Sequence, residues 1–434
     1  MDPNIAMSIS VIGLGFVGLT TALGFAEKGV TVIGYDRDTG RRSMIGSGVV
    51  PFHEPGLTEA LHAHLGTRFR LADSLESAVA DSDTVFLCVG TPSSPDGQAD
   101  LSAVRSAVDD CLRACTDDVF RVLVIKSTVP PGSTRQISAD VEKRLGPQIF
   151  ERFGFAANPE FLREGHSWAD FLEPDRILIG TDEGVSHQRL LRLYSAFPAP
   201  VLRLTTTEAE FVKYLSNTLL ATLISFANET ATLAERVGDI DIARSFAALH
   251  LDKRWNGSPA AMADYVYPGC GFGGYCLPKD TQALAHLAAQ VGAGHGLLDA
   301  VLVANRQAKE SAVTKIVSAS RETDVIGIFG LSFKPGSDDV RESPSADIIR
   351  GLIGRGRLKL IAHDPMAINA FRSTYELPIE YATSATELLN RADILVLATA
   401  WKEYQDLLPT GIGKRVVDLR HCLTSSIAKR EQAA

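Results

Sequence analysis

Short apolar runs alternate with helical segments at the start of the chain. The run ISVIGLGFVG is followed by LTTALGFAEKG, which has helical spacing, and then by a second apolar run, VTVIGYD, that ends at Asp36. Buried parallel strands read as continuous Val and Ile runs, because helices cover both faces of their sheet. The pattern therefore predicts a strand–helix–strand unit over residues 8–36.

The same alternation continues through the first 200 or so residues. Each further apolar run follows a helical stretch, and we expect strands at 84–89, 121–126 and 176–179. Crossover helices are expected to begin near Asp100 and Ser133. This order is typical of a doubly wound α/β domain, which we assign to residues 1–204.

The pattern changes to a long helical repeat at 205–238. Apolar residues recur there at helical spacing without proline or internal glycine, and the threonines at 205–207 can cap the start. The sequence predicts a helix of some thirty residues, roughly 45 Å long. We expect it to join two domains, within a central domain at 205–320. Its apolar face suggests a dimer contact, although an ordinary central helix without dimerisation is the alternative.

Alternation of strands and helices returns in the last third of the chain. We expect strands at 325–333, 358–365, 394–399 and 415–420, with helices at 345–353 and 384–390. These elements predict a second, smaller doubly wound domain at 321–434. The expected fold class is therefore α/β, with two Rossmann-like domains joined by a long central helix.

Composition and charge narrow the classes of function. The chain has 434 residues, 45% of them hydrophobic and 22% charged, which is typical of a soluble globular protein. Its net charge of -9 disfavours nonspecific binding to nucleic acid or to an anionic membrane. No apolar stretch approaches the roughly 20 residues of a membrane span, and no export signal is recognisable. The six scattered cysteines and the dispersed histidines indicate a reduced cytoplasmic chain without a metal site.

A glycine motif occupies the first strand-to-helix turn. Gly13, Gly15 and Gly18 form GxGxxG, in which the glycines permit a tight turn, close approach to a pyrophosphate, and close helix packing. Asp36, at the end of the second strand, can accept both ribose hydroxyls and would repel a 2′-phosphate. The motif therefore favours NAD over NADP, with Arg41 beside the adenosine. The alternative is that the glycines serve packing alone.

A second glycine-rich segment, PGCGFGGYCLPKD, covers residues 268–280. Four glycines in six positions predict a loop whose backbone closely approaches a ligand. Cys276, which precedes Lys279 and Asp280, can act as a nucleophile if nearby positive charge stabilises its thiolate. A carbonyl substrate would then form a thiohemiacetal. The alternative is a buried, unreactive thiol, and Cys270 is the weaker candidate because less charge surrounds it.

Other polar residues occur at suggestive positions. Thr128 lies just after a predicted strand, and Glu160 and Glu164 are four residues apart beside an Asn-Pro turn. Lys213 and Asn217 are also four residues apart and so share one face of the long helix. For Lys213 a surface ion pair is the alternative.

Two cations follow the first strand of the second predicted domain. Lys334 and Arg341 lie in GLSFKPGSDDVRESP and are suited to an anionic phosphate. Solvated loop charges are the alternative.

Seven sequence blocks occur in the order found in one enzyme family. They are GLGFVG, VGTPSSPDGQADLS, STVPPGS, NPEFLREG, EAEFVKYLSN, GFGGYCLPKD and FKPGSDDVRESP. Through nearly its whole length the chain resembles the UDP-glucose/GDP-mannose dehydrogenase family. The resemblance implies an N-terminal NAD-binding domain, a C-terminal nucleotide-sugar domain, and a long helix at a homodimer interface.

The resemblance also implies a chemistry and a set of site residues. The family uses NAD for a four-electron oxidation of a sugar C6 alcohol to a carboxylate, through a cysteine thiohemiacetal and thioester. The implied catalytic residues are Cys276, Lys213, Asn217, Asp280, Thr128 and Glu160. The implied cofactor-binding residues are Gly13, Gly15, Phe16, Val17, Gly18, Asp36, Arg41, Thr91, Thr128, Glu164, Lys279 and Arg341. The implied substrate-binding residues are Glu160, Phe161, Leu162, Arg163, Glu164, Lys213, Asn217, Arg254, Tyr265, Phe272, Gly273, Phe333 and Lys334.

The substrate is expected to be a UDP-sugar. The loop GFGGYCLPKD, with Lys279, is more similar to the members that use UDP-glucose than to those that use UDP-N-acetylmannosamine. GDP-mannose and UDP-N-acetylhexosamines are the alternatives within the family. A hydroxyacid dehydrogenase of the 6-phosphogluconate type, with one oxidation and no cysteine, and a noncatalytic NAD-binding or sugar-sensing protein are alternatives outside it.

Overall fold

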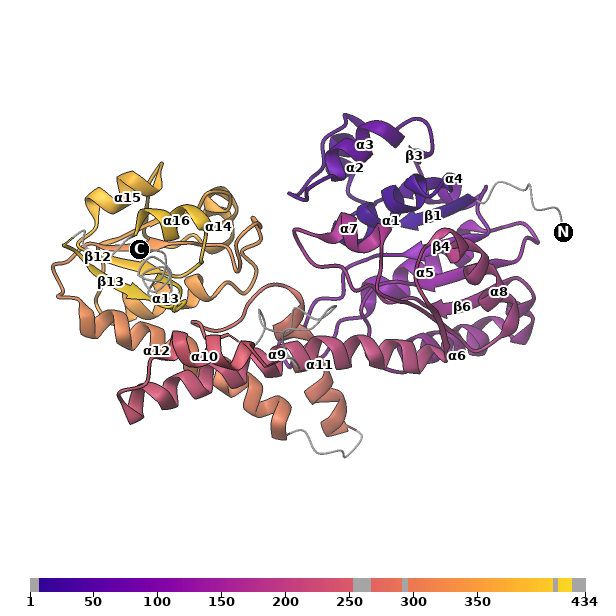
Figure 1. Cartoon of the computed structure of the whole chain (residues 1–434). Helices are drawn as coiled ribbons and strands as arrows, with labels where there is room; N and C mark the ends of the chain where they lie inside the picture. The colour runs from indigo at the N-terminus through magenta and orange to yellow at the C-terminus, as the bar shows by residue number, and fades with distance from the viewer. Residues whose placement is uncertain (1–7, 253–266, 291–295, 409–412, 424–434) are drawn as a thin grey trace. The chain divides into compact units, whose positions relative to one another are not determined.

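The part of the chain that the structure describes contains two sheets, one in each of two units. The structure is a computed structural model that describes residues 8–252, 267–290, 296–408 and 413–423. The units are Met1–Leu215 and Ser216–Ala434, so the boundary falls inside the long helix α9, Thr206–Val237 (Figure 1). The division into domains at 1–204, 205–320 and 321–434 stays a prediction.

Within the described residues, the N-terminal unit contains an eight-stranded sheet of order β3-β2-β1-β4-β5-β6-β7-β8. The strands are β1 Ser8–Ile12, β2 Thr31–Tyr35, β3 Phe69–Leu71, β4 Thr84–Leu87, β5 Arg121–Ile125, β6 Phe153–Ala157, β7 Ile177–Thr181 and β8 Val201–Leu204. The sequence predicted β1, β2, β4, β5 and β7 but not β3, β6 and β8.

The sheet is mixed, because one pair of its described strands is antiparallel. β6 pairs with β7 in the antiparallel sense, and β7 with β8 in the parallel sense. The connection from β6 to β7 holds one short helix, α7 (Ser167–Leu172). The chain therefore re-enters the sheet from the end at which it left, whereas a crossover would have returned it in parallel.

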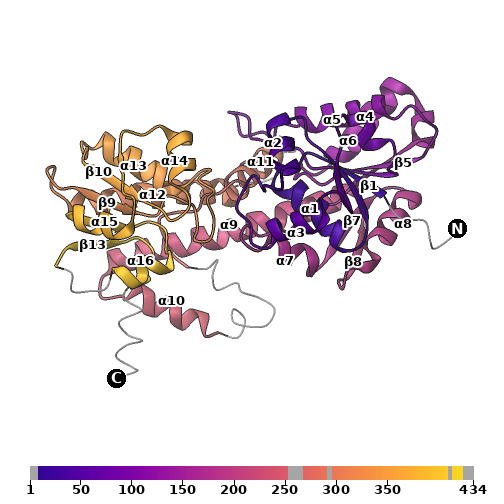
Figure 2. The same cartoon turned by 90° about the horizontal axis from the view of Figure 1, so that it is seen from above.

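Helices cover both faces of this sheet, which confirms the doubly wound prediction (Figure 2). One apolar cluster joins the sheet to α1 (Phe16–Glu27), α2 (Thr39–Gly46), α3 (Leu57–His64), α7 and α8 (Gly184–Leu193). The other cluster joins it to α4 (Leu75–Val79), α5 (Ser102–Ala114) and α6 (Ser133–Leu145). Burial on both faces explains why these strands are apolar without alternation.

Helix α9 confirms the predicted long helix and has 32 residues. Its start is a capping box: the hydroxyl of Thr205 accepts from the Glu208 N–H at 3.2 Å, and the Glu208 carboxylate accepts from the Thr205 N–H at 2.8 Å. Among the residues that the structure describes, the next helices are α10 (Ile242–His250), α11 (Cys276–Gln290) and α12 (Gly296–Ala319).

Within the described residues, the C-terminal unit has a five-stranded parallel sheet of order β11-β10-β9-β12-β13. The strands are β9 Ile326–Phe329, β10 Leu360–His363, β11 Glu380–Tyr381, β12 Ile394–Leu397 and β13 Arg415–Asp418. One face packs against α12, α13 (Pro344–Gly354) and α14 (Ile368–Tyr375), and the other against α15 (Ala385–Arg391) and α16 (Lys402–Leu407). The second doubly wound domain is confirmed.

Both sheets begin with the same turn. Gly13 and Gly330, each directly after its first strand, have positive φ angles of 89° and 106°. Their N–H groups donate to the last carbonyl of the neighbouring strand, at 2.8 and 2.9 Å. The N–H of the next residue, a leucine in both sheets, donates to a buried carboxylate, Asp36 at 2.7 Å and Asp364 at 2.8 Å.

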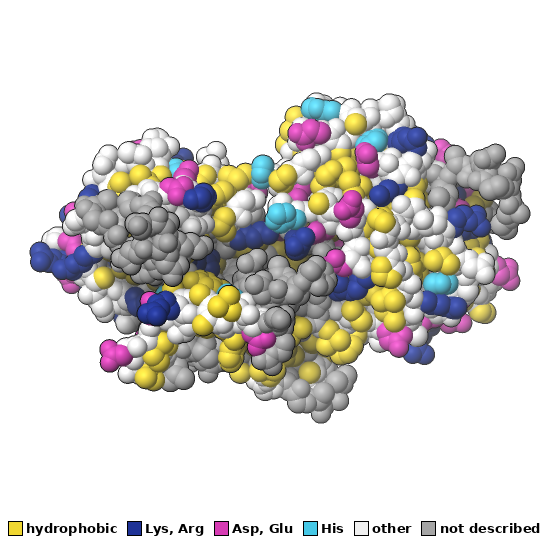
Figure 3. Space-filling model, viewed as in Figure 1, with side chains coloured by type: hydrophobic (Ala, Val, Ile, Leu, Met, Phe, Trp, Pro, Cys, Tyr) yellow, Lys and Arg dark blue, Asp and Glu magenta, His cyan; other side chains and the backbone are white. Residues whose placement is uncertain are grey.

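The surface of the N-terminal unit mixes both signs of charge. On the face in Figure 3, acidic and basic side chains are interspersed over this unit. None of the helices in the described residues combines the length and hydrophobicity that a bilayer span requires.

Candidate active site

The glycines of the first turn serve different physical purposes. A Cβ on Gly13 would lie 2.7 Å from the carbonyl oxygen of Cys88, and one on Gly18 would overlap the carbonyl of Gly13. A Cβ on Gly15, by contrast, would meet no atom within 4 Å. Gly15 is the N-cap of α1 and offers no side chain to the first N–H groups of the helix. This open helix start fits the pyrophosphate of a dinucleotide.

Asp36 lies where a ribose would be recognised. It is 4% exposed, and its Oδ2 accepts from the Leu14 N–H at 2.7 Å and from the Arg41 guanidinium at 2.9 Å. Its Oδ1 accepts from the N–H of Asp38 at 2.9 Å. Because a carboxylate offers about four lone pairs, Oδ1 can accept one further hydroxyl. The residues therefore fit NAD, with Arg41 paired to the carboxylate.

A buried ion pair links α9 to the loop after β6. Lys213 Nζ lies 3.0 Å from Glu160 Oε1, and both side chains are less than a tenth exposed. The Leu162 N–H donates to the second Glu160 oxygen, and the Lys213 ammonium lies 5.3 Å from the ring centre of Phe161. Burial alone would raise the pKa of Glu160, but the charge and hydrogen bond of Lys213 outweigh burial and lower it. Glu160 is therefore held as a carboxylate.

Two residues beside this pair were missed from the sequence. Lys126 Nζ donates to Asn158 Oδ1 at 3.0 Å, and Asn158 Nδ2 donates to the Leu178 carbonyl at 2.8 Å. Burial lowers the pKa of Lys126 to about 8. Lys126 directly follows β5 and Asn158 directly follows β6, and that position at the carboxyl ends of strands was the available signal.

The loop between β5 and α6 carries Thr128 and is fixed at both ends. The hydroxyl of Thr91, which is buried, donates to the Thr128 carbonyl at 2.9 Å. Glu210, one turn before Lys213 on α9, accepts from the N–H groups of Gly132 at 2.6 Å and Thr134 at 2.8 Å. A buried carboxylate from α9 therefore caps α6.

The remaining predicted residues of the NPEFLREG segment differ in their surroundings. Phe161, Leu162 and Glu164 are half-buried, and Arg163 is exposed. The Arg163 guanidinium pairs with Asp170 at 2.6 Å. In the first turn of α1, Phe16 and Val17 are half-buried.

In the C-terminal unit, Cys276 is the first residue of α11. The predicted glycine loop ends where α11 begins, because the glycines stop at 274 and proline at 278 is tolerated in the first turn of a helix. Lys279 and Asp280 therefore lie in that first turn. A helix start and a nearby ammonium both favour a thiolate.

Asp280 joins the first turn of α11 to α9. It is fully buried, and its two oxygens accept from Lys279 Nζ and from Asn217 Nδ2. Burial alone would lower the pKa of Lys279, but the Asp280 carboxylate and the Cys276 sulfur outweigh burial and raise it. A positive charge is therefore maintained beside the thiol.

The glycines of the 268–275 loop are explained by contacts within the protein. A Cβ on Gly269 would lie 2.7 Å from the Arg420 guanidinium, and one on Gly273 would overlap the Glu342 carbonyl. Cys270, the weaker nucleophile candidate, is 1% exposed and lies within an apolar cluster of this unit.

Cationic side chains lie against two aromatic rings near the start of α11. The Arg341 guanidinium lies 4.4 Å from the ring centre of Tyr275, and Lys279 Nζ lies 5.0 Å from the same centre. Arg341 also binds both carboxylate oxygens of Asp339. Lys334 Nζ lies 5.4 Å from the ring centre of Phe333. These cations are suited to phosphate groups of a ligand.

Two predicted substrate contacts, Arg254 and Tyr265, lie outside the described residues. Among the described residues, no group of three or more His, Cys, Asp and Glu side chains is arranged to hold a metal ion.

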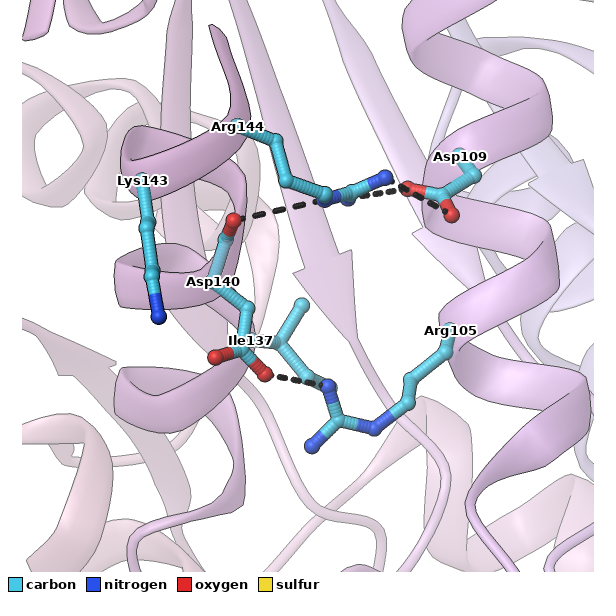
Figure 4. Close-up of a pocket in the computed structure, with 6 residues that line it drawn as sticks. All are labelled: Arg105, Asp109, Ile137, Asp140, Lys143 and Arg144. Atoms are coloured by element: carbon cyan, nitrogen blue, oxygen red, sulfur yellow. Dashed lines mark hydrogen bonds and ion pairs between the residues drawn. The ribbon is translucent and has the colours of Figure 1, made fainter. Parts of the chain in front are cut away.

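A separate pocket lies between α5 and α6 and contains none of the predicted site residues (Figure 4). Two ion pairs cross it, Arg105 to Asp140 and Arg144 to Asp109, both at 2.6 Å. Its arginines are therefore already neutralised by carboxylates of the same pocket.

Comparison with known proteins decides the family. Residues 7–198, 207–307 and 327–425 match the NAD binding, central and UDP binding domains of the UDP-glucose/GDP-mannose dehydrogenase family. The chain belongs to that family. It is an NAD-dependent oxidoreductase, so the predicted fold class and cofactor are confirmed. The family's NAD binding domain contains the open turn at Gly15, and its UDP binding domain contains Lys334 and Arg341.

Similar members of the family match more than nine-tenths of the chain. A UDP-glucose 6-dehydrogenase of Pseudomonas aeruginosa is 36% identical over 416 residues, covering 92% of this chain and 89% of the relative. A UDP-glucose dehydrogenase structure from Pyrobaculum islandicum is 39% identical, with a TM-score of 0.89, and covers 98% of this chain and 97% of its own. A GDP-mannose dehydrogenase structure from P. aeruginosa is 32% identical, with a TM-score of 0.54, covering 95% and 96%.

Proposed function

We propose that this dehydrogenase oxidises UDP-glucose at C6 to UDP-glucuronate in two successive oxidations. The observation that carries the proposal is the start of α11, where Cys276 lies in one turn with the cation Lys279 and the buried Asp280. Two oxidations at one carbon need a nucleophile that can bond to the aldehyde, and a thiol with a nearby positive charge supplies it. Similarity to UDP-glucose 6-dehydrogenases over the whole chain supports the substrate.

The reaction balances as one alcohol, two NAD and one water giving one carboxylate, two NADH and three protons. NAD, when bound, accepts a hydride from C6 in each oxidation. Between the two oxidations, the Cys276 sulfur bonds to the aldehyde carbon, and the carbonyl oxygen takes a proton to form a thiohemiacetal. The second oxidation restores the carbonyl as a thioester. Water then adds to that carbon, the carbon–sulfur bond breaks, and the thiol is regenerated as the carboxylate leaves.

The polar residues take roles that follow from their charges. In this proposal Lys213, kept charged by Glu160, stabilises the oxyanion that forms at C6, and Asn217 donates a hydrogen bond to it. Asp280 and Glu160 orient the hydrolytic water, with Thr128 beside the nicotinamide and Thr91 holding its loop. Lys334 binds the UDP-sugar phosphates, and Lys279 and Arg341 the cofactor side.

Product stoichiometry tests the reaction. UDP-glucose, GDP-mannose and UDP-N-acetylmannosamine are each supplied with excess NAD, and we expect two NADH per product from UDP-glucose alone. Cys276→Ser should stop after the first oxidation or at a slowly hydrolysed ester, whereas Cys270→Ser, in the loop before α11, should keep full stoichiometry. One NADH per product would favour a single-step hydroxyacid dehydrogenase. Full turnover by Cys276→Ser would remove the covalent mechanism.

We also propose that the enzyme is a homodimer formed through one face of α9. Phe211, Leu215, Leu219 and Phe226 are 43–54% exposed, and their spacings of four, four and seven residues place them on the same face. Large apolar side chains in such a row are typical of protein interfaces.

The cytoplasmic location and the role of Arg254 toward a partner subunit's substrate stay predictions.

A further inference from the structure

The peptide of Phe272 is held by one buried side chain. Asn305, on α12, accepts from the Phe272 N–H at 2.8 Å and donates to the Phe272 carbonyl at 3.1 Å. Asn305 is 6% exposed and Phe272 5%. One amide thus satisfies both polar groups of a buried loop residue, a role that a neighbouring strand plays in a sheet.

Gly271, the residue before Phe272, leaves room for the side-chain amide of Asn305. Gly271 has a φ angle of 102°, which favours glycine, and a Cβ there would lie 2.7 Å from Asn305 Oδ1. Glycine at 271 and asparagine at 305 are therefore matched, since a larger residue at 271 would occupy the position of the amide oxygen.

The held peptide lies four residues before the reactive thiol. The Phe272 side chain packs with Ala221 and Val301, and Leu277, in the first turn of α11, packs against the same cluster. Phe272 and the start of α11 therefore share one small core. A shift of the Phe272 peptide would disturb this shared core, and with it the start of α11 at Cys276.

We propose that Asn305 is a positioning residue for the Cys276 thiol. It acts through the Phe272 peptide and does not itself contact the reacting atoms. The proposal rests on the proposed function, in which Cys276 bonds to the sugar aldehyde. Small displacements of a reacting group cost much rate, so loss of the Asn305 bonds should lower kcat more than it affects ligand binding.

The test compares substitutions of equal or smaller size in the full-length enzyme. Asn305→Asp keeps an acceptor for the Phe272 N–H but places a carboxylate oxygen against the Phe272 carbonyl. Asn305→Ser retains a hydroxyl that can bond to only one of the two groups. Asn369→Asp, at an exposed position on α14, is the matched control. For each variant we would measure kcat and KM with UDP-glucose, and the Kd of NAD by calorimetry.

We expect Asn305→Asp to lower kcat by about tenfold or more, with KM and the NAD Kd within about threefold of wild type. The kcat of Asn305→Ser should lie between those of Asn305→Asp and wild type. This variant is used for the comparison if Asn305→Asp does not fold. Asn369→Asp should match wild type. An unchanged kcat in both Asn305 variants, or an equal loss of NAD affinity, would overturn the proposal. Cys276→Ala is assayed in parallel: if it turns over, the proposed function itself fails, independently of Asn305.

Discussion

Lys213 and Glu160 retain their charges in the interior because each faces the other. Burying an isolated ion costs several kcal/mol, and the 3.0 Å pair offsets that cost for both residues. The lowered pKa of Glu160 is the sign of this compensation, since burial acts in the opposite direction. The pair therefore maintains a cation at Lys213 for the oxyanion chemistry proposed above.

Separate substitutions can distinguish the structural role of the pair from its chemical role. Lys213→Met should lower the free energy of unfolding by about 3 kcal/mol at pH 8, because it leaves a buried carboxylate unpaired. The loss should shrink at pH 5, where Glu160 can take a proton. Lys213→Met combined with Glu160→Gln should recover most of the stability but not the turnover. Urea unfolding and NADH formation provide the two measurements, and turnover in the double variant would contradict the role of Lys213.

The sequence indicated these residues singly but not their partners. Lys213 and Glu160 were predicted as site residues through the family resemblance, yet nothing in the chain pairs a helix residue with a loop 53 positions earlier. Lys126 and Asn158, which are 32 residues apart, were missed because each reads as an ordinary strand end. Asn305 was missed because its segment is a regular helix without a motif. Such pairings depend on tertiary packing, which periodicity does not report.

At the scale of elements, the open start of α1 allows NAD binding to be altered without an effect on stability. Gly15 has an ordinary negative φ of -71°, and a Cβ there would meet no protein atom within 4 Å. The first and third glycines of the same motif have no such space. Only the middle glycine can therefore be changed without disturbing the turn.

We expect Gly15→Ala to leave the free energy of unfolding within about 0.5 kcal/mol of wild type. The added methyl group would lie where the pyrophosphate approaches, so the Kd of NAD should rise by about tenfold or more. Calorimetric titration and urea unfolding make the comparison. Gly184→Ala, at the exposed start of α8, is the control and should change neither quantity. Unaltered NAD affinity in Gly15→Ala would show that the dinucleotide does not use this turn.

Glu210 on α9, which caps α6, should make the free energy of unfolding depend on pH. Burial raises the pKa of Glu210 from an ordinary 4.5 to about 7, so between these values the folded state binds more protons than the unfolded state. The free energy of unfolding should therefore decrease as pH rises from about 4.5 to about 7, by up to roughly 3 kcal/mol, and stay level above that.

Glu210→Gln should lack this decrease, because glutamine does not titrate. Urea unfolding at pH 5 and pH 8 measures it, and groups common to both proteins cancel in the comparison. Glu142→Gln, at an exposed position on α6, should retain the wild-type pH dependence. An identical pH dependence in Glu210→Gln would exclude Glu210 as its source.

Most elements were predicted from the hydrophobic pattern, and the errors have physical causes. The long helix and most strands with continuous apolar runs were predicted to within a few residues. The strands β3, β6 and β8 were missed because their sequences, FRL, FGFAA and VLRL, contain arginine, glycine or alanine and are not continuous Val and Ile runs. The reversed direction of β7 depends on the end of the sheet at which the chain re-enters, which the hydrophobic pattern does not indicate. The start of α11 was obscured by the glycines just before it.

At the scale of the whole molecule, substitutions in the row of apolar side chains on α9 test the proposed homodimer. Leu219→Glu and Phe226→Glu place charges within the proposed interface, so we expect them to convert a dimer into a monomer. Light scattering after gel filtration measures the mass. Val185→Glu, at a 56% exposed position on α8, is the control and should leave the dimer intact. A wild-type protein with the mass of a single chain would contradict the proposed dimer.

The shared first turn of the two sheets has a practical consequence. The helix after Gly13 starts without a side-chain cap, whereas α13 is capped by Ser343, whose hydroxyl accepts from the Ser345 N–H at 3.3 Å. The chain thus contains its own reference structure. A change at Asp364 reports what such a carboxylate contributes to folding alone, and the same change at Asp36 adds whatever a dinucleotide contributes. A change at Asp36 should therefore weaken NAD binding as well as the fold, whereas a change at Asp364 should leave NAD affinity unaltered.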